Sequence, residues 1–197
     1  MPSYSYGQMR HIHLIRHAQT RPTPGLLGPQ WPLTPEGHAQ ARKLAAQLPN
    51  LNITRVITST EDKAVATGRA IAEYLALPLE TRLGLEEHGR LTVSATATLE
   101  DFQEGMQRLF AFPTERVFGD ESADAARLRL TKALDDLMEE KDGDALVVSH
   151  GTVISLLVAH ANNLDAREFW RSVAMPDYLV LAWPSFQLVH HAFPSID

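Results

Sequence analysis

Three short apolar segments, each followed by a stretch with helical periodicity, constrain the fold of this chain more than any other feature. The segments are 11–16 (HIHLIR), 54–59 (TRVITS) and 145–149 (ALVVS). Strands that are buried in a parallel sheet appear as short, nearly continuous apolar runs. Because strands that alternate with helices form a mostly parallel sheet covered on both faces, the pattern predicts an α/β fold, a three-layer α/β/α sandwich.

Capping residues and apolar spacing indicate where the helices begin. Thr34 is a suitable N-cap, Pro35 suits the first turn that follows it, and apolar residues recur at helical spacing from Ala41 to Leu48. The proline-rich and glycine-containing segment 21–32 is predicted to be a loop. Further helices are predicted over 64–75, 99–112, 122–140 and 152–162, irregular segments over 81–94 and 113–119, and a late strand pair over 178–183 and 186–191.

The length of 197 residues and the 44% hydrophobic content predict one domain spanning residues 1–197. Residues 1–10 are polar and form an N-terminal extension to this domain. The segment from about 81 to 120 lies between the central strands, and we expect it to cover the site and to shape substrate choice.

Composition and charge exclude several functional classes. The absence of cysteine excludes disulfides and cysteine-ligated metals. The start of the chain lacks the apolar core of a signal peptide, and the apolar stretch 153–161 is too short to span a bilayer. We therefore expect a cytoplasmic protein with no membrane partner. The net charge of −6 argues against nucleic acid as a partner but not against a small phosphorylated ligand.

Two histidines follow two of the predicted strands directly. His17 follows Arg16 at the end of the first strand, and His150 follows the strand 145–149 at the start of a helix. Ligands of open α/β sheets bind at the carboxyl ends of the strands. The guanidinium of Arg16 matches phosphate oxygens, and a helix N-terminus favours anions. The alternative for either histidine is a solvated strand end or a position beside a helix cap.

Four motifs in order resemble the histidine phosphatase superfamily, the phosphoglycerate-mutase-like proteins. Arg16-His17-Ala18 resembles the Arg-His-Gly signature of that superfamily, and Ser149-His150-Gly151 resembles its second histidine motif. Segment 33–41 resembles its helix opening, and segment 58–64 occupies the place of its Ser-x-x-x-Arg-Ala motif. The resemblance extends from about residue 11 to residue 183.

The resemblance implies a mechanism that these residue types are able to perform. His17 attacks phosphorus and becomes a phosphohistidine. Arg16, Lys63 and His150 hold the phosphoryl oxygens and stabilise the transition state. The implied substrate is a small phosphorylated molecule, and neither a metal nor another cofactor is implied.

Two departures from the family pattern bear on the phosphate site. Lys63 stands where the family has its second arginine, and lysine cannot make the bidentate contact. Arg69 cannot replace that arginine, because six residues along a helix it faces another way. Ala18 in place of glycine is a small change.

The general acid is predicted in segment 85–90, which resembles the Leu-x-Glu segment of the family. Glu87 matches the acid, with Glu86 as the alternative one residue away. The Gly-aromatic continuation of the mutase branch is missing here, which favours a phosphomonoester hydrolase over a mutase. A non-catalytic binder of phosphorylated ligands is the third hypothesis, because Lys63 departs from the family pattern.

Two other histidine pairs are candidate sites. His11 and His13 share one face of a strand, as a metal pair does, but no third ligand is in view. His190 and His191 lie on a late strand and point in opposite directions, so we interpret them as structural or surface residues.

Overall fold

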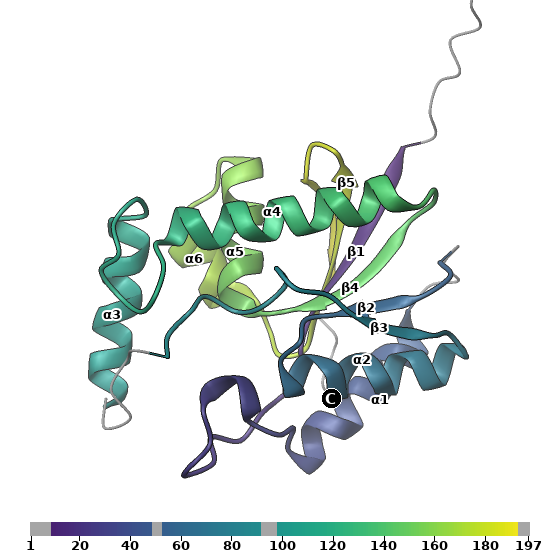
Figure 1. Ribbon diagram of the computed structural model, residues 1–197, viewed down its shortest axis with the longest axis horizontal. Helices are drawn as coiled ribbons and strands as arrows, with labels where there is room; N and C mark the ends of the chain where they lie inside the picture. Colours follow the sequence, from purple (N-terminus) through teal and green to yellow (C-terminus); the bar gives the residue numbers. More distant parts are fainter. Residues whose placement is uncertain (1–8, 49–52, 92–97, 193–197) are drawn as a thin grey trace, which may run out of the picture.

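A sheet with strand order β3-β2-β4-β1-β5-β6 forms the middle layer of the molecule (Figure 1). The computed structural model describes residues 9–48, 53–91 and 98–192. The pairs β1–β4, β4–β2 and β2–β3 are parallel, whereas β5 pairs antiparallel with both β1 and β6. The predicted mostly parallel α/β sheet is therefore confirmed. The strands are β1 (Arg10–Arg16), β2 (Val56–Thr58), β3 (Leu79–Thr81), β4 (Ala145–Ser149), β5 (Asp177–Trp183) and β6 (Gln187–Ala192).

Helices cover both faces of this sheet (Figure 1). Helices α1 and α2 pack on one face, and α4, α5 and α6 pack on the other, with α3 beside α6. Along β1, Ile12 and Leu14 join the core under α4 and α5, whereas Ile15 joins the core under α1 and α2. The helices are η1 (Gly28–Gln30), α1 (Pro35–Gln47), α2 (Asp62–Leu75), α3 (Leu99–Ala111), α4 (Ala123–Glu140), α5 (Gly151–Asn162) and α6 (Ala166–Ser172).

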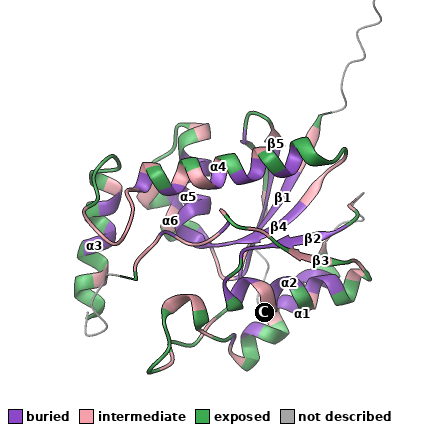
Figure 2. Ribbon diagram, viewed as in Figure 1, coloured by how far each residue is buried: buried purple, intermediate pink, exposed green. Residues whose placement is uncertain are grey.

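The buried residues lie along the strands and on the helix faces that meet them (Figure 2). Helix α5 is buried over most of its length, which agrees with its apolar sequence. Within the described residues, no helix is both long and apolar enough to cross a membrane.

Local sequence signals place most of these elements correctly. The Thr34 hydroxyl accepts the N–H of Gly37 at 2.9 Å, and the Ser122 hydroxyl accepts the N–H of Ala125 at 3.1 Å, so both are N-caps. Strand β3 and helix α6 were not predicted, because three and seven residues are too few to show a clear period. Part of the covering segment, 92–97, and most of the N-terminal extension, 1–8, lie outside the described residues.

Gly68 lies inside α2, where glycine costs helix stability. A Cβ atom at this position would lie 2.2 Å from Cγ2 of Thr58 on β2. Threonine is β-branched and rotates little about χ1, so it has little freedom to move away. The glycine therefore allows α2 to approach β2 closely, and this approach places the start of α2 at the carboxyl edge of the sheet.

We predict that Gly68→Ala lowers the free energy of unfolding. Overpacking costs about 1–3 kcal/mol, and the higher helix propensity of alanine offsets up to about 1 kcal/mol of that cost. Urea denaturation measures the difference. Gly28→Ala is the control, because nothing lies within 4 Å of its Cβ position. A Gly68→Ala chain as stable as wild type would show that the close contact is not needed.

Candidate active site

The parallel pairing of β1 with β4 brings His17 and His150 together. Arg16 pairs in register with Ser149, so the two histidines follow at the same edge of the sheet. The backbone N–H of His17 donates to the Ser149 carbonyl at 3.0 Å. The two imidazole centroids lie 5.2 Å apart, and both rings are buried. This edge is where the sequence placed a ligand site.

His17 is held in one tautomer. Its Nδ1 lies 2.8 Å from the Ala18 carbonyl oxygen, and because a carbonyl only accepts, Nδ1 carries the proton and Nε2 keeps its lone pair. Burial lowers the pKa of His17 well below 6.5, and the positive charges of Lys63 and Arg16 lower it further against the opposing Ala18 hydrogen bond. His17 is therefore a neutral imidazole with a free Nε2, which is the nucleophilic form.

His150 is completely buried beside it. Its Nε2 lies 2.8 Å from the Ser59 hydroxyl oxygen. Burial lowers the pKa of His150 to about 3; the Glu87 charge opposes this, whereas Lys63 lowers the pKa further. Among the described residues, its Nδ1 has no hydrogen-bond partner. An orphaned buried ring nitrogen is a place where a polar ligand binds at low desolvation cost.

Arg16 directs its guanidinium across the start of α5. Its Nη1 donates to the carbonyls of Val173 at 2.7 Å and Ala174 at 3.3 Å, whereas its buried Nε has no partner in the described part of the chain. A Cβ on Gly151 would lie 2.8 Å from both Cζ and Nε. Glycine at position 151 therefore allows the guanidinium to lie flat against the helix start, which is the physical reason for the glycine in the second motif.

The loop that holds Arg16 is itself fixed by Asp177, which is fully buried at the start of β5. One carboxylate oxygen accepts from the Ala174 N–H at 3.0 Å and lies 2.8 Å from Nε2 of His191. His191 therefore makes a structural contact with the residue that fixes this loop, in line with its interpretation as a structural or surface residue.

Glu87 caps the N-terminus of α5. Its carboxylate accepts from the N–H groups of Thr152 at 3.1 Å, Val153 at 3.2 Å and His88 at 2.8 Å. Burial raises the pKa of this carboxyl, but the positive charge of Arg90 and the amide N–H donors of Thr152 and His88 outweigh burial and lower it. Glu87 is therefore ionised in the resting protein.

Glu86, the alternative acid, lies apart from α5. Its carboxylate accepts from the Thr60 hydroxyl at 2.8 Å and from the Gly84 N–H at 2.7 Å. Of the two glutamates, the structure places Glu87 against His150 and the start of α5.

Lys63 lies at the start of α2 and is buried. Its ammonium donates to the Gly28 carbonyl at 2.8 Å and lies 2.6 Å from Oε2 of Glu61. Its charge acts on both histidines, so it belongs to the same group. We refer to Arg16, His17, Lys63, Glu87 and His150 together as the strand-end cluster.

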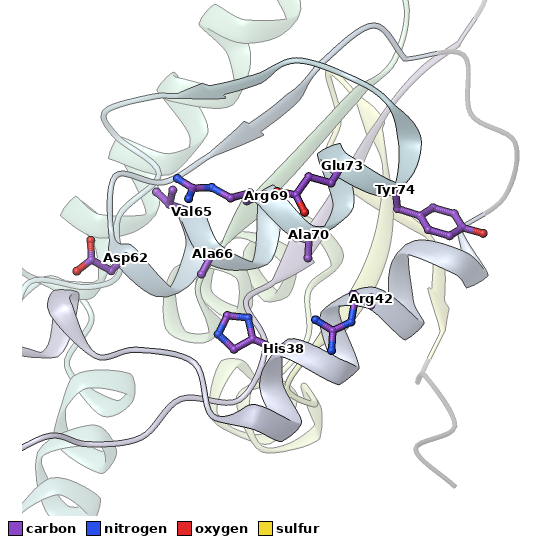
Figure 3. A pocket seen from close by; sticks show the side chains of 9 residues that line it. All are labelled: His38, Arg42, Asp62, Val65, Ala66, Arg69, Ala70, Glu73 and Tyr74. Carbon is purple, nitrogen blue, oxygen red and sulfur yellow. The ribbon is translucent and has the colours of Figure 1, made fainter.

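Arg69 lies outside this cluster, as its helical position predicts. It is exposed and lines an open groove of about 730 Å³ between α1 and α2, together with His38, Arg42 and Tyr74 (Figure 3). No member of the strand-end cluster lines this groove.

Two charged residues next to the cluster were not anticipated from the sequence. Glu61 is buried and pairs with Lys63. Arg90 donates to the Thr152 hydroxyl at 2.7 Å, and its guanidinium lies 5.5 Å from the ring centroid of Phe102 and 5.9 Å from that of Phe118. In the sequence, Glu61 lies two residues before Lys63, and Arg90 lies three residues after Glu87. This spacing was the available signal, but spacing alone does not show which way a side chain points.

His11 and His13, the first of the two other histidine pairs, make contacts with neighbouring side chains. His13 Nδ1 lies 2.7 Å from the Tyr178 hydroxyl, and His11 Nδ1 lies 3.8 Å from Oδ2 of Asp144. In the described part of the chain, no group of three or more His, Asp or Glu side chains is arranged to hold a metal ion.

Comparisons with known proteins identify relatives of this chain. A family model of the histidine phosphatase superfamily (branch 1) matches residues 12–181. The probable phosphoglycerate mutase GpmB of Enterobacter sp. strain 638 is 30% identical over 175 residues, which cover 80% of this chain and 77% of the relative.

Solved structures share the fold at low sequence identity. A mycobacterial glucosyl-3-phosphoglycerate phosphatase is 20% identical with a TM-score of 0.72, covering 93% of this chain and 97% of that one. A phosphoserine phosphatase of Entamoeba histolytica, solved with 3-phosphoglyceric acid, is 18% identical with a TM-score of 0.73. The match covers 95% of this chain and 98% of that one.

The buried histidines predict that stability falls on acidification. The folded-state pKa values of His17 and His150 are lowered, whereas histidine in the unfolded chain titrates near about 6.5. Below about pH 6.5 the unfolded state therefore binds more protons than the folded state. The stability that each neutral histidine contributes above that pH is lost below it, and the free energy of unfolding falls by up to about 1.4 kcal/mol per pH unit for each histidine.

Urea denaturation at about pH 7 and about pH 5 measures this effect, with the midpoint expected to fall. Glu87 adds little to the change, because over this range its carboxyl is ionised in the folded chain and mostly ionised in the unfolded chain, where glutamate titrates near about 4.3. In His150→Gln the dependence should be shallower, since one of the neutral histidines is removed. A wild-type midpoint that is constant or rises on acidification would contradict the assignment.

Proposed function

This chain belongs to the histidine phosphatase superfamily, and from that premise we propose that it hydrolyses a small phosphomonoester through a phosphohistidine on His17. The observation that carries the proposal is the state of His17. Its ring is neutral, its Nδ1 proton is engaged by the Ala18 carbonyl, and its Nε2 lone pair is free beside Lys63 and His150.

In the first step, Nε2 of His17 attacks phosphorus. The bond from phosphorus to Nε2 forms as the bond to the leaving oxygen breaks, and the leaving oxygen takes the electron pair. The Arg16 guanidinium, the Lys63 ammonium and the orphaned His150 nitrogen are the groups available for the equatorial oxygens. Cationic side chains supply the charge stabilisation in this scheme, so we expect turnover to persist in the presence of a chelator.

Glu87 is the group proposed to move the proton. Its carboxylate is ionised in the resting protein, but a phosphate dianion bound beside it raises its pKa, as like charges do. The protonated carboxyl then donates to the leaving oxygen. In the second step the carboxylate takes a proton from water, whose oxygen attacks phosphorus and releases His17 and inorganic phosphate.

Hydrolysis is favoured over phosphoryl transfer to a second hydroxyl. The Gly-aromatic continuation after Glu87 that is typical of the mutase branch is missing. The mutase remains the second candidate because the 30% identical relative bears that name. Release of inorganic phosphate during turnover of small phosphorylated acids, such as phosphoserine and 3-phosphoglycerate, separates the two.

We predict that a rapid quench under alkaline denaturing conditions traps phosphate on His17, because phosphohistidine survives alkali. His17→Ala should carry no label and should lose at least about 10³-fold in turnover, as expected for removal of a nucleophile. His38→Ala, on the exposed side of α1, is the control and should keep the label. A label on His150 or a serine, or wild-type turnover by His17→Ala, would refute the assignment.

Glu87→Gln should slow hydrolysis by about 10²–10⁴-fold, the range expected for loss of a general acid. The loss should be smaller with p-nitrophenyl phosphate than with an alkyl phosphate, because a good leaving group needs no proton. Glu86→Gln is the matched variant and should cost less than about tenfold, since its carboxylate faces Thr60 and Gly84. If Glu86→Gln is the more damaging change, the acid is assigned one residue away from its true position.

A further inference from the structure

A second buried carboxylate, Glu61, lies against the strand-end cluster, and the proposed mechanism does not use it. Glu61 is only 6% exposed to solvent. Its Oε1 accepts the N–H of Glu87 at 2.8 Å and lies 3.7 Å from Nε2 of His150. Its Oε2 lies 2.6 Å from the Lys63 ammonium and has no hydrogen-bond partner elsewhere in the described residues.

The start of α2 does not itself require a buried acid. Glu61 is the N-cap residue, but its side chain makes no capping hydrogen bond. A negative charge favourable to the helix dipole is already provided by Asp62, which is exposed in the first turn. The hydrogen bond from Glu87 needs only an acceptor oxygen, which a glutamine also offers. The charge of Glu61 is therefore not explained by local structure.

The negative charge of Glu61 pairs with the ammonium group of Lys63. An ammonium group has three donors, and here the Gly28 carbonyl accepts from Nζ while the Glu61 carboxylate lies 2.6 Å away as an ion-pair partner. A phosphate dianion that binds at Lys63 therefore meets an ion pair rather than a free cation. Because charges interact strongly in a buried site, the carboxylate weakens the attraction of Lys63 for phosphate.

We infer that Glu61 is the internal counter-ion of Lys63 and that it sets the affinity of the site for phosphate. It is a positioning residue that acts through Lys63, and it keeps inorganic phosphate weakly bound so that product leaves. The inference rests on the proposed function only in that phosphate binds at the strand-end cluster.

Titration calorimetry with inorganic phosphate, on the full chain at fixed pH and low salt, tests this inference without turnover. Glu61→Gln keeps the acceptor oxygen for Glu87 and removes the charge. It should bind phosphate about tenfold more tightly, which corresponds to about 1.4 kcal/mol. Asp62→Asn removes the same charge one residue away, in an exposed position, and should bind within about twofold of wild type. Unchanged or weaker binding by Glu61→Gln would overturn the inference.

A second comparison tests whether Glu61 acts through Lys63. In a Lys63→Met background there is no ammonium group whose attraction for phosphate Glu61 could weaken. Adding Glu61→Gln to Lys63→Met should therefore change phosphate affinity by less than about twofold. A full tenfold gain in that background would show that Glu61 repels phosphate directly, contrary to the inference. If Glu61→Gln fails to fold, Glu61→Met removes the same charge, and its phosphate affinity decides the question by the same criterion.

The role of Glu61 as a counter-ion and the phosphohistidine mechanism can be tested separately. Tighter phosphate binding by Glu61→Gln, in a chain that forms no phosphohistidine, supports the counter-ion and refutes the mechanism. In the steady state, Glu61→Gln should lower both KM and the inhibition constant of phosphate without raising kcat. A purely structural role for Glu61 would raise KM or leave it unchanged.

Discussion

The hydrogen bond from Nδ1 of His17 to the Ala18 carbonyl is the interaction on which the chemistry of this site depends. It fixes the proton on one ring nitrogen and leaves the other with its lone pair. The acceptor is itself held in place, because the N–H of Ala18 donates to the Thr67 hydroxyl on α2 at 3.0 Å. Burial keeps the ring neutral, so in the mechanism that we propose His17 needs no separate base to activate it.

The groups around His17 are brought together by the carboxyl ends of parallel strands. Strand β1 carries Arg16, strand β4 leads into His150, and β2 leads into the helix that carries Lys63. Close approach is possible because glycine at position 151 leaves room for the Arg16 guanidinium. The balance of charge follows from the same packing, since Lys63 is buried against Glu61 and the Glu87 carboxylate lies 3.6 Å from the Arg90 guanidinium. The site therefore combines the cationic groups that we propose for phosphate with a buried carboxylate, Glu61, that we infer limits how tightly phosphate is held.

The sequence predicted the parts of this arrangement that depend on local pattern. Runs such as 145–149 predict buried strands, Thr34 and Ser122 predict helix starts, and the order of strands and helices predicts the sheet edge at which His17 and His150 meet. It did not predict contacts that depend on the direction of a side chain in three dimensions. The pairing of Glu61 with Lys63 and the position of Arg90 near two phenylalanine rings are examples. Gly68 was recognised only as a poor helix residue, because its close neighbour Thr58 lies on a different element.

Identifying which ring nitrogen of His17 carries the phosphoryl group tests the proposed mechanism most directly. Phosphohistidine trapped from the wild-type chain can be assigned to Nδ1 or Nε2 by NMR of the modified imidazole. Because Nδ1 is protonated and donates to the Ala18 carbonyl, the account predicts phosphorylation at Nε2. Phosphorylation at Nδ1 would require that hydrogen bond to be broken before attack, and would contradict the central claim.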